Sequence, residues 1–305
     1  MTADVLPQLT AEVTAAAHPN AAPCHCGTTT LAHRADTTVL RHAETVAKAH
    51  APDTDPTGLT RRLATAARLP EVFLPPLTAA PAAFVDDRPV TLWPYGAPLD
   101  PDAPEAAPWE AAAVLLARLH RTQPTSAVPP MRGPAKAALA VTRLRATLAT
   151  APPHPAAPPV LRAWSALPAW ARAEAPMPGA PALCHGDLHL GQLVRHPAPD
   201  GPWRLIDVDD LGVGVPAWDL ARPASWYACG LLPPDEWTRF LTAYRTAGGP
   251  AVPADGDPWA DLDVPARALT VQTAARYLAK ALTAGRPLDE VEQSLIDACA
   301  RMAPE

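Results

Sequence analysis

The chain has 305 residues and a formal net charge of −6, from 25 lysines and arginines against 31 aspartates and glutamates. Hydrophobic residues make up 48% of it and charged residues 18%, which argues against a globally disordered chain. The acidic balance is the opposite of the basic surface that nucleic-acid binding requires, so we expect no nucleic-acid partner.

The first 18 residues lack the basic and apolar regions of a signal peptide, and no run of about 18 apolar residues occurs that could span a membrane. The five cysteines are odd in number and scattered, which does not indicate a disulfide framework. We therefore expect a cytoplasmic protein with no membrane partner.

Two of these cysteines form the short motif Cys24-His25-Cys26, which resembles half of a zinc site. Structural zinc needs four ligands, and no second Cys-x-x-Cys or His-x-x-x-His pair accompanies the motif. From the sequence alone we interpret it as a chance arrangement.

Short Thr- and Val-rich runs separated by polar breaks predict three antiparallel strands within residues 27–49. Residues 57–70 have helical spacing up to Pro70, and residues 90–93 read as a further strand that Pro94 and Gly96 interrupt. Beyond residue 100 helical periodicity dominates, at residues 109–120, 135–149, 236–245, 265–282 and 289–302. Two stripes predict core-facing sides of the last helices: Trp237, Phe240, Leu241 and Tyr244, and Val291, Leu295, Cys299 and Met302.

One irregular stretch, residues 183–220, concentrates ionisable side chains. Strand-like residues 192–195 and 203–208 flank the turn PAPDG, which predicts a β-hairpin. The motif His185-Gly186-Asp187-Leu188-His189 precedes the hairpin, and Asp207, Asp209 and Asp210 follow its second strand. We expect these side chains to converge at one end of the hairpin.

Carboxylates clustered with an amide suit Mg²⁺, which prefers oxygen ligands and commonly binds one or two carboxylates together with substrate phosphates. Asp187 precedes Gln192 by five positions, the interval between the base and the metal-binding amide in the kinase catalytic loop. Asp207 stands where a second metal-binding carboxylate is needed.

The motifs HGDLHLGQ, LIDVDD and PAWDLA resemble those of the aminoglycoside phosphotransferase and choline kinase-like family, as do LLARLH at 115–120, VAKAH at 46–50 and TLWPY at 91–95. The glutamine of HGDLHLGQ is similar to the variant of maltokinase-like members. The resemblance implies an α+β, bilobal, protein-kinase-like fold, with a small antiparallel-sheet nucleotide-binding lobe at 1–95 and a larger, mostly helical catalytic and acceptor-binding lobe at 96–305.

The resemblance also implies ATP and Mg²⁺ as cofactors and assigns roles to individual residues. Asp187 matches the catalytic base, and Asp219 matches a hydrogen-bond partner of the catalytic loop. Lys48 matches the lysine that holds the α- and β-phosphates. The remaining candidates are His189 for catalysis, the main-chain groups of Leu92, Trp93 and Tyr95 for adenine, and Gln192 and Asp207 for magnesium.

Two features depart from the family pattern. No Gly-x-Gly-x-x-Gly motif lies between the first strands, so backbone N–H groups of residues 33–37 would have to cover the phosphates. The helix expected at 57–70 contains no carboxylate, so Lys48 lacks the glutamate partner usual in kinases.

These motifs together predict an ATP-dependent O-phosphotransferase that moves the γ-phosphate to a hydroxyl of a small molecule, namely an aminoglycoside, a sugar or an amino alcohol. Two alternatives remain open. One is a metal-dependent phosphohydrolase, since a two-metal centre could be formed by His185, Asp187, His189, Asp207 and Asp209. The other is a nucleotide-binding pseudokinase, which the missing helix carboxylate would favour.

Overall fold

A computed structural model describes residues 5–20, 24–34, 36–100, 102–103, 106–125, 127–179 and 181–302. The chain divides into two compact units. The first, here called the sheet unit, contains the described residues up to Ala107 together with Thr125–Pro129 and Leu190–Asp209. The second, the helical unit, contains Pro108–Pro124, Pro130–His189 and the described residues from Asp210 onward.

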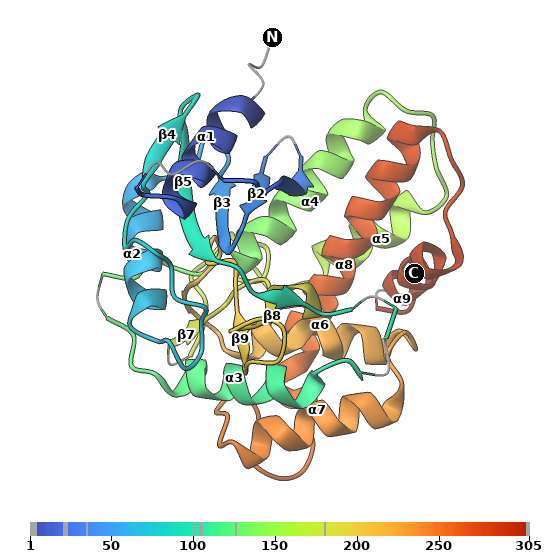
Figure 1. Ribbon diagram of the computed structural model, residues 1–305. Coiled ribbons are helices and arrows are strands. Elements are labelled where there is room, and N and C mark those ends of the chain that lie inside the picture. The colour runs from blue at the N-terminus through green and yellow to red at the C-terminus, as the bar shows by residue number, and fades with distance from the viewer. Residues whose placement is uncertain are drawn as a thin grey trace. The chain divides into compact units, whose positions relative to one another are not determined.

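The sheet unit is built on an antiparallel sheet of five strands in the order β1-β2-β3-β5-β4 (Figure 1). The three strands expected within residues 27–49 are present as β1 (Thr28–His33), β2 (Thr38–His42) and β3 (Thr45–Ala49). The expected strand at 90–93 is the centre of β5 (Arg88–Pro94), and β4 (Ala83–Val85) adds a short edge strand.

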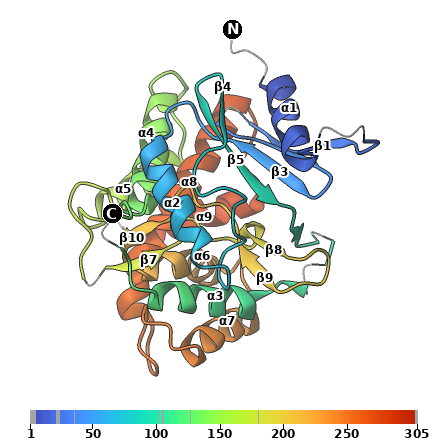
Figure 2. The same cartoon turned by 60° about the vertical axis from the view of Figure 1, so that its left-hand side comes forward.

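One face of this sheet is covered by helix α1 (Leu6–Ala17), as Figures 1 and 2 show. Leu9 and Val13 of α1 are fully buried in a core with Leu40 of β2 and Ala47 of β3. Side chains alternate between the faces of a strand, so Lys48, next to Ala47, lies on the face away from α1. The helix expected at 57–70 is α2 (Pro56–Ala67), whose first turn is capped by Asp55.

The predicted hairpin is confirmed as β8 (Leu193–Arg195) paired with β9 (Trp203–Leu205). It joins the sheet unit because β8 also pairs with β6 (Ala97–Pro98), and because Leu205 exchanges backbone hydrogen bonds with residues 72–74. This grouping differs from the lobe boundary at 95 and 96 expected from the sequence, which placed the hairpin in the second lobe.

The helical unit contains all five helices that periodicity predicted beyond residue 100, together with α5 and α6. Its helices are α3 (Trp109–Arg121), α4 (Gly133–Leu148), α5 (Ala157–Ser165), α6 (Ala217–Ala228), α7 (Pro234–Thr246), α8 (Trp259–Ala284) and α9 (Glu290–Met302). A short antiparallel pair, β7 (Ala182–Cys184) with β10 (Gly212–Gly214), lies among them. Within the described residues, no helix combines the length and the apolar character needed to cross a membrane.

The predicted core stripes are confirmed with one exception. Trp237, Phe240, Leu241 and Tyr244 of α7 are buried, as are Leu295 and Cys299 of α9, and Met302 is partly buried against the same core. Val291 is 49% exposed. It stands in the first turn of α9 with its side chain exposed to solvent, so the prediction that it faces the core was wrong.

Candidate active site

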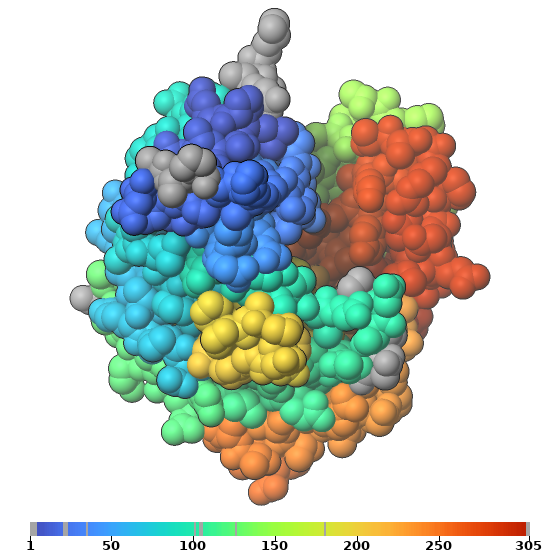
Figure 3. All heavy atoms as spheres, in the orientation of Figure 1, coloured from blue at the N-terminus to red at the C-terminus, as the bar shows by residue number. Residues whose placement is uncertain are grey.

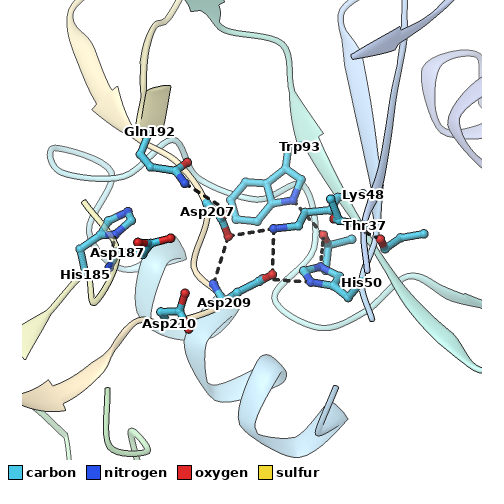
Figure 4. Close-up of polar contacts among 12 residues, drawn as sticks. Thr37, Lys48, His50, Trp93, His185, Asp187, Gln192, Asp207, Asp209 and Asp210 are labelled. Atoms are coloured by element: carbon cyan, nitrogen blue, oxygen red, sulfur yellow. Dashed lines mark hydrogen bonds and ion pairs between the residues drawn. The ribbon is translucent and has the colours of Figure 1, made fainter. Parts of the chain in front are cut away.

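Lys48 is the centre of a charged cluster in the sheet unit (Figure 4). Its Nζ lies 2.8 Å from Asp207 Oδ1 and 2.9 Å from Asp209 Oδ2, and its side chain is only 13% exposed. Neither carboxylate comes from α2, the helix in which a kinase glutamate would be sought. The ion-pair partners of Lys48 follow strand β9 instead, 159 and 161 residues further along the chain.

The ionisation of this cluster is set by a competition between burial and charge. Burial alone would lower the pKa of the Lys48 ammonium, but the attraction of Asp207 and Asp209 outweighs it and raises that pKa above its ordinary value. Burial likewise opposes ionisation of Asp209, yet Lys48 and His50 together hold the pKa of that carboxyl well below its usual range. Lys48 and Asp209 are therefore both charged at neutral pH.

His50 connects this cluster to the strands beneath it, and sequence reasoning missed it. Its Nδ1 lies 2.9 Å from Asp209 Oδ1, and its Nε2 lies 2.9 Å from the hydroxyl of Thr91 (Figure 4). The same hydroxyl accepts a hydrogen bond of 2.9 Å from Trp93 Nε1. The ring is 1% exposed, and His50 directly follows β3, the strand that carries Lys48, so Asp209 is held by two neighbouring residues of this segment.

Gln192 and Asp207, the two predicted magnesium ligands, lie together in the sheet unit. The side-chain amide nitrogen of Gln192 is 3.3 Å from Asp207 Oδ2. Ile206 donates its N–H to the main-chain carbonyl of Gln192 at 2.9 Å. Two neighbouring ligands of an octahedral Mg²⁺, each about 2.1 Å from the ion, are about 2.9 Å apart. Turning the amide to present its oxygen would thus give a carboxylate and a carbonyl oxygen at a spacing that suits Mg²⁺.

Asp207 adopts a left-handed backbone conformation, with φ of +66°. Aspartate tolerates this region better than most residues, but the conformation still carries strain. It positions the carboxylate so that one oxygen reaches Lys48 and the other reaches Gln192.

The main-chain groups expected to hold adenine are largely used within the protein. Tyr95 donates its N–H to Glu44 O at 2.8 Å, and its carbonyl accepts from His196 Nδ1 at 2.9 Å. The Leu92 carbonyl accepts from Leu77 N–H at 2.8 Å. The Tyr95 N–H is thus occupied in this structure, and Trp93 is paired with Val46 in the ladder of β3 and β5, so each of the three residues has main-chain groups engaged within the sheet unit.

The turn expected to cover the phosphates is similarly closed on itself. Arg34 and Thr37 exchange backbone hydrogen bonds of 2.8 and 3.3 Å, and Ala35 between them lies outside the described residues. Two of the N–H groups that would have faced a phosphate are therefore already donated to carbonyls.

Asp187, the predicted base, is held by two cations in the helical unit. Lys136 Nζ of α4 lies 2.6 Å from Asp187 Oδ2, and Arg222 Nη2 of α6 lies 2.8 Å from Asp187 Oδ1. Lys136 also pairs with Asp210 Oδ2 at 2.6 Å. Sequence reasoning missed both cations, although Lys136 is one of only three lysines in the chain, which was a signal available for it.

Burial works against ionisation of Asp187, but the charges of Lys136 and Arg222 prevail and lower the pKa of the carboxyl. His189, the other predicted catalytic residue, contributes a smaller effect of the same sign and is half-buried. Asp187 is consequently a carboxylate at neutral pH, the form that a general base requires.

The loop that carries Asp187 is held by hydrogen bonds to Asp219, which is 1% exposed. Its carboxylate accepts the N–H of His185 at 2.6 Å, the N–H of Gly186 at 2.7 Å and His120 Nε2 at 3.0 Å. Asp219 is thus the hydrogen-bond partner of the loop that the family resemblance implied. Because a carboxylate only accepts, His120 donates from Nε2 and its Nδ1 faces the Tyr244 hydroxyl at 2.7 Å.

Gly186 is required in this loop for two reasons. Its φ is +86°, a conformation that other residues rarely adopt. A Cβ atom there would also lie 2.4 Å from the carbonyl oxygen of Asp210. Any side chain at this position would displace either the backbone of Asp210 or the loop that carries Asp187.

Comparison with known proteins identifies a family model that matches the sequence and solved structures with a similar fold. Residues 29–262 match the model of the phosphotransferase enzyme family. No curated protein sequence matches the chain.

Among solved structures, a choline/ethanolamine kinase family protein from Mesorhizobium loti superposes with a TM-score of 0.61, at 17% identity over 99% of this chain and 96% of that one. The macrolide 2'-phosphotransferase MphH from Brachybacterium faecium gives 0.52, at 18% identity over 97% and 98%. Spectinomycin phosphotransferase APH(9)-Ia, in complex with ADP and spectinomycin, gives 0.57, at 13% identity over 91% and 89%. The expected α+β, protein-kinase-like fold is confirmed.

Proposed function

The chain belongs to the phosphotransferase enzyme family, and from this membership we propose that it transfers the γ-phosphate of ATP to a hydroxyl group of a small, uncharged acceptor such as a sugar. The observation that carries the proposal is the state of Asp187. Lys136 and Arg222 keep it ionised, while Asp219 fixes the backbone on which it stands. An ionised carboxylate held in a fixed position is what abstraction of a hydroxyl proton requires.

In the proposed reaction Asp187 accepts a hydrogen bond from the acceptor hydroxyl. The hydroxyl oxygen forms a bond to the γ-phosphorus, the bond from that phosphorus to the bridging oxygen breaks, and ADP leaves. The hydroxyl proton passes to Asp187 and from there to solvent. The transition state is loose, so the main contribution of the protein is positioning and charge neutralisation.

We assign nucleotide binding to the sheet unit, which contains most of the lobe expected from the sequence to bind nucleotide. Lys48 would bind the phosphates through its ammonium, which the cluster keeps charged. Gln192 and Asp207 would hold Mg²⁺, whose chemistry when bound is to neutralise charge on the transferred phosphoryl group. Leu92, Trp93 and Tyr95 stay proposed for contacts with adenine, and the indole of Trp93 is fixed by Thr91.

The choice of an uncharged acceptor rests on the charges around Asp187. Both of its carboxylate oxygens are paired with cations, and Asp210 is paired with Lys136 and lies 3.8 Å from Arg132. Three cations therefore surround two carboxylates in this cluster. A polycationic aminoglycoside would be repelled by that balance, whereas a neutral polyol could donate and accept hydrogen bonds there.

The ion pairs also weigh against the phosphohydrolase alternative. In such a two-metal centre Asp187 would bind metal, whereas both of its carboxylate oxygens are paired with cations. The pseudokinase alternative rested on the lack of a carboxylate for Lys48, and the structure provides two. Both alternatives become outcomes of the same test.

The test is Mg²⁺-dependent ADP release from ATP, measured across sugars, amino alcohols and aminoglycosides, beside an Asp187→Asn control. Acceptor-dependent release with a sugar, lost in the variant, supports the proposal. Release with an aminoglycoside alone contradicts the assignment of a neutral acceptor. Phosphate release from phosphate esters without ATP would establish a phosphohydrolase, and ATP binding without turnover of any acceptor would establish a pseudokinase.

A further inference from the structure

Four side chains that could bind a metal gather beside the sheet, away from every residue assigned above. They are His18, Cys24, Cys26 and His42, and one ligand atom from each lies within 4.8 Å of the others. His18 directly follows α1, the two cysteines precede β1, and His42 ends β2. All four belong to the sheet unit.

The distances in this cluster agree with those around a tetrahedral metal ion. Cys24 Sγ lies 3.3 Å from His42 Nε2, and the rings of His18 and His42 meet edge to face with centroids 5.2 Å apart. Zinc binds sulfur at about 2.3 Å and imidazole nitrogen at about 2.0–2.1 Å, so a tetrahedral site places such a pair about 3.6 Å apart. Small adjustments around an ion, which widen this pair slightly and draw in the more distant ligands, would bring the cluster to that geometry.

His42 is oriented in the way that metal-binding histidines are. Its Nδ1 lies 2.9 Å from the hydroxyl of Thr28, its partner in the register of β1 and β2. With the Nδ1 proton donated to that hydroxyl, Nε2 presents its lone pair toward Cys24. A hydrogen bond from the second ring nitrogen is the usual means by which proteins fix the tautomer of a histidine ligand.

His18 supplies an independent observation. Its Nε2 is buried from solvent and has no hydrogen-bond partner. A buried imidazole nitrogen without a partner is costly, because its hydration is lost and nothing replaces it. A metal ion bound by the cluster would remove that cost.

We propose that His18, Cys24, Cys26 and His42 bind one Zn²⁺ in a Cys₂His₂ structural site. Two thiolates and two imidazoles are a donor set typical of tetrahedral zinc, and they complete the coordination without an open position. Binding releases the two thiol protons to solvent, so occupancy falls as the pH is lowered. His25, the histidine between the cysteines, is exposed and takes no part.

The proposed role of the ion is structural. The ion would fasten the end of α1 to the start of β1 and the end of β2, and α1 covers the sheet on the face opposite Lys48. Strand β1 is exposed along most of its length, and the N-terminal segments, blue in Figure 3, lie at the surface. Metal coordination at this edge would therefore stabilise β1, a strand with few buried side chains.

The first experiment measures zinc in the full-length protein, purified under reducing conditions without a metal-affinity tag. We expect about one zinc per chain in the wild type and in the matched control His25→Ala. The double variant Cys24→Ser/Cys26→Ser should retain about tenfold less or lower still, with circular dichroism confirming that it is folded. About one zinc per chain in the double variant would contradict the site. If the purified wild type carries no zinc, the metal titration below decides whether the site binds it.

The second experiment does not depend on a variant that folds. Wild-type protein freed of metal by a chelator is titrated with Co²⁺, for which tetrahedral thiolate coordination gives intense visible and charge-transfer absorption. We expect saturation at about one Co²⁺ per chain, displacement by Zn²⁺ and an increase in melting temperature with zinc. Absence of these bands, or a Cys24–Cys26 disulfide in the reduced preparation, overturns the proposal.

Discussion

Lys48 Nζ and Asp207 Oδ1 are joined at 2.8 Å although 159 residues separate them in the chain. Strand β3 carries the lysine, and the β8–β9 hairpin carries the aspartate into the same unit. If the two bind the phosphates and the magnesium ion as proposed, this ion pair sets their separation. Disturbing either residue should then affect both ATP use and stability.

Lys48→Met should raise the KM for ATP by at least about tenfold, because the phosphates lose their cation. It should also lower the free energy of unfolding by about 1–3 kcal/mol, because Asp207 and Asp209 are left facing each other without a counter-charge. Steady-state kinetics and urea denaturation measure the two effects. Lys280→Met, at an exposed lysine of α8, is the matched control and should leave both unchanged. Normal ATP kinetics in Lys48→Met would remove Lys48 from the nucleotide site.

The stability of the protein should fall in acid in part through Asp209. Lys48 and His50 hold the pKa of Asp209 below the value near 3.9 of an unfolded aspartate, so its stabilising effect is complete above that value. It is lost as the pH falls toward the lower pKa of the folded state. Urea unfolding of the wild type and Asp209→Asn between about pH 6 and pH 2.5 should therefore show a stability difference that shrinks with acidification. A difference that stays constant over this range would show that Asp209 is not stabilised by these charges.

Asp219→Ala should be strongly destabilising. The change removes a buried acceptor and leaves the N–H groups of His185 and Gly186 and the His120 ring without it, at a cost of about 3–5 kcal/mol. Asp263→Ala removes an exposed carboxylate that pairs with Arg267 and should cost less than about 0.5 kcal/mol. Chemical denaturation of the two variants compares them directly, and equal costs would show that the loop does not depend on Asp219.

Lys136→Met tests whether the charge of Lys136 sets the pKa of the proposed base, Asp187. Without this cation the pKa of Asp187 should rise toward its ordinary value, so the acid limb of kcat/KM should move to higher pH. We expect kcat to fall by about 10- to 100-fold while the KM for ATP changes little. The control Arg143→Met lies on the exposed side of the same helix α4. An unchanged pH profile in Lys136→Met would show that Lys136 does not govern Asp187.

Asp187→Asn should reduce turnover by about 10²–10⁴-fold and leave nucleotide binding within about twofold, because the amide cannot take the hydroxyl proton. Calorimetric titration with a non-hydrolysable ATP analogue separates binding from turnover. Retained turnover would rule out Asp187 as the base.

The sequence by itself determined the elements and the motif. Alternation and periodicity located the strands of residues 27–49, the hairpin after Gln192 and, among the described helices beyond residue 100, all except α5 and α6, because these patterns reflect which face of each element is buried. The motifs HGDLHLGQ, LIDVDD and PAWDLA carried the resemblance to the family. Such short-range patterns are written along the chain and need no tertiary information.

Only the tertiary structure decided which charges compensate one another. The partners of Lys48 come from the residues after β9, and those of Asp187 come from α4 and α6. His18 and His42, which complete the set begun by Cys24 and Cys26, are brought together by the packing of α1 on the sheet. Local propensity does not encode these contacts, because ion pairing and metal ligation depend on distance in space, and hydrophobic packing of distant segments sets that distance.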